Sequence, residues 1–281
     1  MNNEIIVVNK PIDYTSRDVV NKLIRIKGTR KIGHTGTLDP LATGVLVCVT
    51  NKYTKLVEII TGLEKEYIAS IKLGISTDTL DITGEVIKAS NTEYYDEDYI
   101  KKILNSFVGE YSSEVPLYSA VRVKGKRLYE YARNNIEVDA PIRNVYIKEI
   151  ELIDYKDDII TFRVVVSKGT YIRSLIQSIC DKLNTCGTMS SLVRTKQGNF
   201  KIEDSYSLED IEKGNYKSLS IKDVLDVSVV ELNDALFKKV INGNKLEIQY
   251  SGYVLFVKDN EEIALYEFLN NIGKLKIMLC S

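Results

Sequence analysis

The residues whose types could do chemistry are concentrated in one short stretch, residues 33–44, which reads GHTGTLDPLATG. It holds three glycines, three threonines, one histidine and one aspartate between two apolar segments. Glycine and Asp-Pro are common in turns, and a single Asp before Pro is usually structural. Loops held by a rigid scaffold, however, are where functional groups tend to lie. The concentration of polar groups therefore makes Asp39 a candidate reactive group.

Two familiar motifs are excluded at this position. Gly28 and Gly33 have the spacing of a phosphate-binding loop, but His34 stands where that loop needs its Lys. Aspartyl-phosphate chemistry usually has a second carboxylate two residues after the nucleophile, and that position is Leu41. The chain also contains neither G-x-S-x-G nor H-E-x-x-H. The remaining interpretation is that Asp39 acts as a nucleophile or base without a cofactor.

A carboxylate in an enclosed site needs a nearby cation to stay ionised, because desolvation raises its pKa. The best candidate is Arg173, in the first turn of a predicted helix. From Gly169 onward the apolar residues follow helical spacing, and Arg173 lies off their stripe. It would therefore point away from the face that the helix packs against the core.

Strands and a few helices must position these residues. Residues 65–73 alternate, with Tyr67, Ala69, Ile71 and Leu73 on one side of a half-buried strand. Other strands are predicted at residues 4–8, 45–49, 119–124, 144–153, 159–166 and 189–194, and from about Val229 to the end. Helices are predicted from Ser16 and over residues 96–107. This order predicts an α+β fold with a mixed, mostly antiparallel sheet core and flanking helices.

Composition limits the class of protein. The chain has 281 residues, with 38 Lys plus Arg against 39 Asp plus Glu, and no apolar run long enough for a membrane span. Its beginning, Met-Asn-Asn-Glu, does not read as a signal peptide. Four scattered cysteines predict reduced thiols in the cytoplasm and no metal site. The near-neutral charge argues against nucleic acid, but basic residues cluster at 22–31 and 122–133, and 18 tyrosines would suit stacking on bases.

Several longer motifs resemble, in order, those of the bacterial tRNA pseudouridine-55 synthase (TruB) family. They are residues 33–44, 65–67, 77–84, 115–120, 125–133 and 167–173, within a resemblance that covers roughly residues 5–200. The resemblance implies the pseudouridine synthase fold and an isomerase that converts uridine 55 in the tRNA T-loop to pseudouridine by base flipping. It implies no redox cofactor, ATP or metal, and a cytoplasmic enzyme expected to be a monomer.

The resemblance also assigns roles to residues. Asp39 matches the catalytic aspartate, Arg173 its partner, and Tyr67 the aromatic residue that stacks on the target base and could assist a proton transfer. The substrate-binding residues would be His34, Tyr171, Leu192, Asp81 and Lys10, with Leu192 lining the base pocket and His34 filling the space left by the displaced base. Attack on sugar C1′, addition to the ring and proton abstraction from the sugar are all compatible with one carboxylate.

The predicted domains are residues 1–228, the catalytic domain, and 229–281, a shortened RNA-binding domain of the PUA type that is small and β-rich. One departure from the family is Asp13, where the family usually has Gly, which puts a backbone contact to RNA in question.

Two other functions are compatible with this scaffold: a non-catalytic tRNA-binding or tRNA-folding protein, and the subunit of a guide-RNA-dependent pseudouridine synthase.

Overall fold

The computed structural model describes residues 3–280, and the outermost positions of both predicted domains, 1–2 and 281, lie outside them. Its main feature is a nine-stranded sheet in which seven strands follow the order β1-β3-β12-β4-β11-β10-β7, with β2 beside β3 and β13 beside β12. These strands are β1 (Ile5–Lys10), β2 (Ile32–His34), β3 (Thr43–Thr50), β4 (Lys65–Leu73), β7 (Gly109–Glu114), β10 (Ile142–Lys156), β11 (Ile159–Val166), β12 (Gly187–Gln197) and β13 (Phe200–Lys201).

All pairs in this sheet are antiparallel except β3 with β12, whose Thr43 and Gly44 lie beside Val193 and Arg194. The predicted mixed, mostly antiparallel core is therefore confirmed. The parallel pair joins two antiparallel halves of the sheet, and the loop that carries Asp39 enters β3 at this junction.

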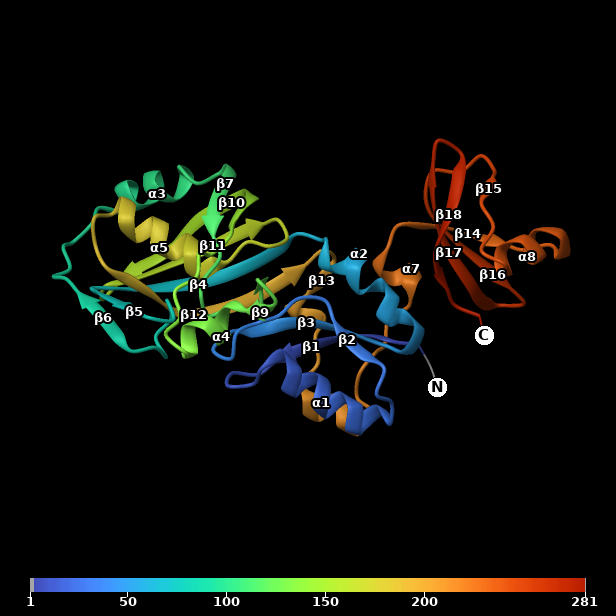
Figure 1. Ribbon diagram of the computed structural model, residues 1–281, viewed down its shortest axis with the longest axis horizontal. Coiled ribbons are helices and arrows are strands. Elements are labelled where there is room, and N and C mark those ends of the chain that lie inside the picture. The colour runs from blue at the N-terminus through green and yellow to red at the C-terminus, as the bar shows by residue number, and fades with distance from the viewer. Residues whose placement is uncertain (1–2, 281) are drawn as a thin grey trace.

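Some helices cover one face of the large sheet and share a hydrophobic cluster with it, and others pack against the opposite face of β1 and β3. Figure 1 shows α3 and α5 together along one side of the sheet and α1 at the other half. The helices of this part of the chain are α1 (Ser16–Lys27), α2 (Val57–Thr61), α3 (Glu97–Asn105), α4 (Leu128–Arg133), α5 (Ile172–Lys182), α6 (Leu208–Lys213) and α7 (Ile221–Val224), with short 3-10 turns at η1 (Asn51–Leu56) and η2 (Ile202–Asp204).

The burial of β3 and β4 explains their different sequence patterns. In β3 seven of the eight residues are buried, because both faces of this strand are covered. In β4 only alternate residues are buried, and they include Tyr67, Ala69, Ile71 and Leu73, as the alternation predicts. A continuous apolar run and an alternating one thus mark strands with two covered faces and with one.

The last strands form a separate five-stranded sheet at one end of the molecule (Figure 1), in the order β14-β16-β17-β18-β15. They are β14 (Val227–Glu231), β15 (Leu246–Glu247), β16 (Gly252–Lys258), β17 (Glu261–Leu269) and β18 (Ile272–Met278). The predicted C-terminal β-rich lobe is present. We propose a domain division near the predicted 228/229, although β14 already begins at Val227.

Two predictions of secondary structure were wrong. The C-terminal lobe also contains α8 (Asp234–Ile241), whose N-terminus is capped by Asn233, with Oδ1 accepting from the Leu236 amide at 2.8 Å. The strand predicted at 119–124 shrinks to β8 (Arg122–Val123), because Lys124 and Gly125 turn the chain at once into β9 (Lys126–Arg127). The remaining strands, β5 (Ile75–Thr77) and β6 (Val86–Ala89), form a small hairpin of their own.

Candidate active site

The loop that carries Asp39 is clamped by the segment that follows β1. The Lys10 ammonium is fully buried and donates to the carbonyl oxygens of Pro11 at 2.8 Å, Pro40 at 3.2 Å and Tyr14. The backbone amide of Asp13 also donates to the Pro40 carbonyl, at 2.9 Å. Because two separate donors hold Pro40, the position of its neighbour Asp39 is tied to the end of β1.

Ser16, the first residue of α1, holds the other side of the same loop. Its Oγ accepts from the Leu38 amide at 2.8 Å and donates to the Leu38 carbonyl at 3.2 Å. Within the loop, the Ala42 amide donates to the Asp39 carbonyl at 3.0 Å and closes a turn. The backbone on both sides of Asp39 is therefore hydrogen-bonded, and only its side chain is left to face other groups.

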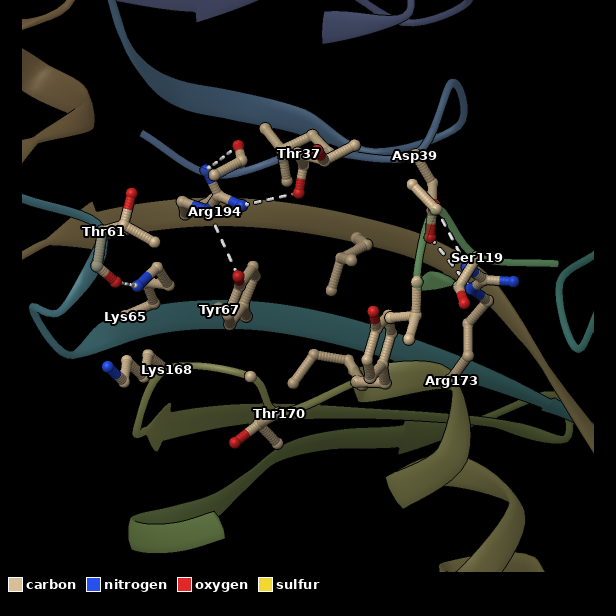
Figure 2. Close-up of a pocket in the computed structure, with 18 of the residues that line it drawn as sticks. Thr37, Asp39, Thr61, Lys65, Tyr67, Ser119, Lys168, Thr170, Arg173 and Arg194 are labelled. Carbon is tan, nitrogen blue, oxygen red and sulfur yellow. Dashed lines mark hydrogen bonds and ion pairs between the residues drawn. The ribbon is translucent and has the colours of Figure 1, made fainter. Parts of the chain in front are cut away.

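That side chain forms a bidentate ion pair with Arg173 (Figure 2). Arg173 Nε lies 2.9 Å from Oδ2 of Asp39, and Nη2 lies 3.1 Å from Oδ1. The guanidinium also donates to the carbonyls of Thr79 and Tyr118, each at 3.0 Å. The side chain of Arg173 is 5% exposed and that of Asp39 is 31% exposed, so the buried cation holds a carboxylate that opens to solvent.

The pKa of Asp39 is raised above its ordinary value. Removal of water by the surrounding protein is the largest cause, the Arg173 cation opposes it, and the negative charge of Asp81 adds to it. Without Arg173 the carboxylate would be still harder to ionise. The ion pair therefore keeps a desolvated carboxylate available as an anion.

Asp39 and Arg173 line a pocket of about 440 Å³. Tyr67 of β4, Leu192 of β12 and Tyr171 line the same pocket, so the structure brings together five of the eight residues singled out in the sequence. Tyr67 and Leu192 are each 6% exposed. The pocket therefore combines an aromatic ring, an aliphatic side chain and a paired carboxylate, which suits a flat, partly polar ligand.

The other three predicted residues lie outside the pocket lining. Asp81 accepts hydrogen bonds from the amide and hydroxyl of Thr83 and from the Thr79 hydroxyl, so it organises the loop before β6. His34 lies on β2, and burial lowers its pKa and favours the neutral ring. Lys10 lies beneath the Asp39 loop, as described above. Lys10 and Asp81 thus contact segments that hold Asp39 and Arg173, whereas His34 lies on the strand that precedes the Asp39 loop.

The comparison with known proteins agrees with this geometry. The profile described as "TruB family pseudouridylate synthase (N terminal domain)" matches residues 24–172. The "tRNA pseudouridine synthase B" of Mesoplasma florum is 40% identical over 277 residues, covering 97% of this chain and 96% of that protein. That of Clostridium tetani is 42% identical over 274 residues, covering 96% and 94%.

The chain belongs to the TruB family of pseudouridylate synthases. Solved structures support the fold of this family. The chain aligns with one in a "Cbf5-Nop10-Gar1 Complex" at a TM-score of 0.72 and 24% identity, covering 99% of this chain and 84% of that one. A second, from an H/ACA RNP bound to a substrate RNA containing 2′-deoxyuridine, aligns at a TM-score of 0.70 and 23% identity, covering 99% and 85%. At such identities the likeness concerns the fold alone.

In this TruB-family chain, the sequence analysis missed Arg194, the last residue of the strand predicted at residues 189–194. Arg194 is 1% exposed and lines the pocket. Its Nε donates to Tyr67 Oη at 3.2 Å, Nη1 to the carbonyls of Gly36 and Val45, each at 3.2 Å, and Nη2 to that of Thr37 at 3.1 Å. It therefore connects Tyr67 to the Asp39 loop.

A signal for Arg194 was present in the sequence. It lies two residues after Leu192 in a predicted strand, so the two side chains share a face. Ser119 was also missed. It lines the pocket, and its Oγ is buried without a hydrogen-bond partner among residues 3–280. Such an oxygen is available to a bound ligand.

The basic cluster predicted at residues 22–31 is less free than its sequence suggests. Lys22 pairs with Glu212 at 2.7 Å, and Lys27, only 15% exposed, pairs with Glu4 at 2.8 Å and packs on the ring of Tyr216. These two lysines connect α1 to α6, to Tyr216 and to the residues before β1. Because their charges are already neutralised, they are poor candidates for RNA contacts.

Among residues 3–280, no group of three or more His, Cys, Asp or Glu side chains is arranged to hold a metal ion. Within the same described range, no helix is both long and apolar enough to cross a membrane.

Proposed function

We propose that this chain converts uridine 55 in the T-loop of tRNA to pseudouridine, with Asp39 as its catalytic residue. Membership of the TruB family and the tRNA pseudouridine synthases at about 40% identity support the reaction and the substrate. Asp39 is assigned as the catalytic residue because it forms a bidentate ion pair with buried Arg173 in a pocket that Tyr67 also lines.

The reaction breaks the bond between sugar C1′ and base N1 and joins C1′ to a ring carbon. That carbon loses its proton and N1 gains one, so the product is an isomer. Asp39 would be the anionic group that starts this exchange at the sugar or the base. The pocket volume of about 440 Å³ lies within the usual range for small ligands, about 300–1,000 Å³.

The target base must first leave the folded loop of the tRNA, which costs a few kcal/mol. Stacking on Tyr67 would return about 1–3 kcal/mol of this. Leu192 and Tyr171 would complete the walls around the flipped nucleotide, and Ser119 Oγ could hydrogen-bond to it. Arg194 already donates to Tyr67 Oη, which leaves the hydroxyl proton of Tyr67 directed elsewhere and available for a transfer.

Two of the three predicted residues outside the pocket lining would act indirectly in this proposal. Lys10 would fix Pro40 and thereby Asp39, and Asp81 would hold the turn whose Thr79 carbonyl accepts from Arg173. His34, at the base of the same loop as Asp39, would occupy the space that the flipped base vacates in the RNA. We therefore regard Lys10 and Asp81 as positioning residues.

The deciding experiment compares wild type with Asp39→Asn on unmodified tRNA, with pseudouridine mapped by mass spectrometry. The wild type should form pseudouridine at position 55, and the variant should lose on the order of a thousandfold or more in rate. Its affinity for tRNA should be nearly unchanged, because the substitution keeps the shape of the side chain. Asp13→Asn is a matched control, since Asp13 lies next to the same loop but outside the pocket lining.

The same assay separates the alternatives. A non-catalytic tRNA-binding or tRNA-folding protein would bind tRNA and leave its uridines unchanged. A guide-RNA-dependent subunit would be inactive on free tRNA and would need added guide RNA. Full turnover by Asp39→Asn would contradict the proposed role of Asp39 even if wild type formed the product.

The remaining proposals concern the C-terminal lobe and the state of the protein. We propose that β14–β18 with α8 form a shortened PUA-like RNA-binding domain, in which Lys238, Lys239 and Lys245 supply positive charge. We also propose a monomer in the cytoplasm, where the buried free thiols of Cys48, Cys180 and Cys186 would stay reduced. Sedimentation analysis of the wild type would test whether it is a monomer. Measurement of tRNA binding by the Lys238→Gln and Lys239→Gln variants would test the RNA-binding role of the C-terminal lobe.

A further inference from the structure

The pocket contains more positive charge than the pair of Asp39 and Arg173 requires. Asp39 is the one carboxylate among the residues that line it. Besides Arg173, four cationic side chains line the same pocket: Lys65, Arg143, Lys168 and Arg194. This local excess of cations contrasts with the chain as a whole, which is close to neutral.

None of these four cations forms an ion pair with a carboxylate in the described part of the chain, whereas Lys22, Lys27, Arg163 and several others do. Arg194 is 1% exposed and Lys65 is 7% exposed. A buried charge without a counter-ion is costly. Carbonyl oxygens offset part of this cost, as they do for Lys10, and a bound anion would offset more of it. Cations in this position would be compensated by an anion.

Lys65 has a donor to spare. Its Nζ donates to the carbonyls of Thr61 at 2.8 Å and Leu63 at 2.7 Å, which occupies two of the three N–H groups. Burial, together with the charges of Arg194 and Lys168, lowers the pKa of Lys65 to about 8, so these cations are close enough to repel one another. A bound anion would relieve this repulsion.

The position of the cluster fits a nucleotide. In Figure 2, Lys65 and Lys168 lie on one side of Tyr67, while Asp39 and Arg173 lie on the other. Arg194 stands above Tyr67 with its guanidinium carbon 5.4 Å from the ring centroid. With a base at Tyr67 and the reacting bond at Asp39, the opposite end of the pocket is left for the charged backbone.

We propose that Lys65, Lys168 and Arg194 form a phosphate subsite, which takes one phosphodiester of the RNA strand that carries the target uridine. Lys65 and Lys168 supply the free N–H donors. Arg194 donates most of its N–H groups to Tyr67 and to backbone carbonyls, so it contributes positive charge to the subsite without a direct hydrogen bond to the phosphate. The inference rests on the proposed function, because it takes the occupant of the pocket to be RNA.

The test uses a tRNA T-stem-loop in which single phosphates are replaced, one at a time, by neutral methylphosphonates. Equilibrium affinities are measured for full-length wild type, Lys168→Gln and Lys213→Gln. Lys168 is exposed, so its substitution should leave the fold intact. Lys213→Gln is the control, since it removes an exposed charge outside the pocket lining.

We expect one linkage beside the target uridine at which the neutral replacement weakens wild-type and Lys213→Gln binding by about tenfold, as loss of one charge-assisted contact should. In Lys168→Gln the same replacement should have little further effect. The slope of log affinity against log salt should fall by about 0.7 in this variant. Lys65→Met, if it folds, should show the same loss of sensitivity at the same linkage.

Equal effects of all linkages, or the same linkage effect in wild type and Lys168→Gln, would overturn the subsite. Competition by millimolar inorganic phosphate without any sensitive linkage would also overturn it, because the cations would then serve a free anion. Turnover keeps the two proposals apart. If wild type forms pseudouridine but no linkage depends on Lys168, only the subsite fails; if wild type forms none, the proposed function fails.

Discussion

At the scale of single residues, the pair of Asp39 and Arg173 combines two opposing effects on one carboxylate. Desolvation raises the pKa of Asp39, and the buried guanidinium limits that rise. The guanidinium therefore favours the anionic form of a carboxylate whose surroundings exclude water. The chemistry proposed for Asp39 depends on this balance.

The balance predicts the pH dependence. Asp39 must be ionised to act, so activity should be present above its pKa and lost as the pH falls through it. Because the pKa is raised, this loss should begin above the ordinary value for Asp, about 3.9. Arg173→Gln removes the opposing cation, so the acid limb of kcat/KM against pH should move to still higher pH, and kcat should fall while tRNA affinity is kept.

The control for this prediction is Arg163→Gln, because Arg163 pairs with Glu66 and Glu149 and lies outside the pocket lining. Its pH profile should match that of wild type. A defect of Arg173→Gln confined to tRNA affinity, with an unmoved acid limb, would contradict the proposed pairing role.

Arg194 is expected to position Tyr67 and the Asp39 loop. Arg194→Lys keeps the charge but cannot reproduce bonds to Tyr67, Gly36, Val45 and Thr37 from one ammonium group. We expect kcat to fall on the order of a hundredfold, since small displacements of reacting groups have such effects. The free energy of unfolding should drop by about 1–3 kcal/mol.

The appropriate comparison is Arg163→Lys, an Arg of the same sheet whose partners are partly exposed carboxylates, where a change below about 1 kcal/mol is expected. Denaturant unfolding and single-turnover kinetics measure the two effects. An unchanged kcat in Arg194→Lys would show that Arg194 does not position the reacting groups.

At the scale of elements, the decisive feature is the parallel pair of β3 and β12, where Gly44 lies beside Arg194. Gly44 also pairs with Lys10 of β1, so three strands meet at this glycine. Its φ is +95°, and a Cβ built there would lie 2.3 Å from the Arg194 carbonyl oxygen. The close approach of backbone at this point holds both Arg194 and the end of the Asp39 loop.

Gly44→Ala should therefore separate the strands and displace the site. We expect a loss of about 2–4 kcal/mol in the free energy of unfolding, together with a reduced kcat. Gly214→Ala is a close control, because Gly214 also has a positive φ, +79°, but no atom lies within 4 Å of its Cβ position. It should cost about 1 kcal/mol and leave kcat unchanged. Equal effects of both substitutions would contradict the steric argument.

Asp13 stands where the sequence resemblance predicts Gly, and the structure shows how the turn accommodates it. It has a φ of +65°, the left-handed conformation that Gly adopts readily and Asp adopts more easily than most residues. Its backbone amide bonds to Pro40 within the protein. The turn after β1 therefore keeps its shape with Asp, and this amide positions the Asp39 loop.

At the scale of the whole molecule, the C-terminal sheet packs directly against the catalytic lobe. Leu255, Leu265 and Ile277 of that sheet share a hydrophobic cluster with Ile5 and Val7 of β1. The hydroxyl of Tyr53, in η1, donates to Glu262 of β17 at 2.5 Å. The buried contact gives the two lobes a common core, so we expect them to unfold together.

Leu265→Ala tests this coupling. Leu265 is fully buried, and the substitution should cost about 2–5 kcal/mol. Hydrogen exchange should become faster in β1 and β3 as well as in β17, because the cavity opens the shared core. Leu269→Ala, at a residue 66% exposed, should change neither. Faster exchange limited to the C-terminal lobe would show that the lobes are stable independently.

The amino-acid sequence was sufficient to predict most local elements and to single out Asp39 as the candidate reactive group. The spacing of apolar residues is a property of neighbouring positions, so it predicted the strand of Tyr67 and the helix of Arg173 within a few residues. The sequence did not predict helix α8, because with a single buried residue, Val240, its apolar periodicity is weak among the surrounding strands. Motifs in family order also predicted the function that the comparisons support.

The tertiary structure alone decided which groups meet. Asp39 and Arg173 are 134 residues apart, and Arg194 reaches Tyr67 across 127 positions. It also decided that Lys10 is buried under the loop and that Lys27 is neutralised by Glu4. Residue type and spacing set what a side chain can do. The long-range pairing of strands sets its neighbours, and those neighbours determine its charge state and its access to substrate.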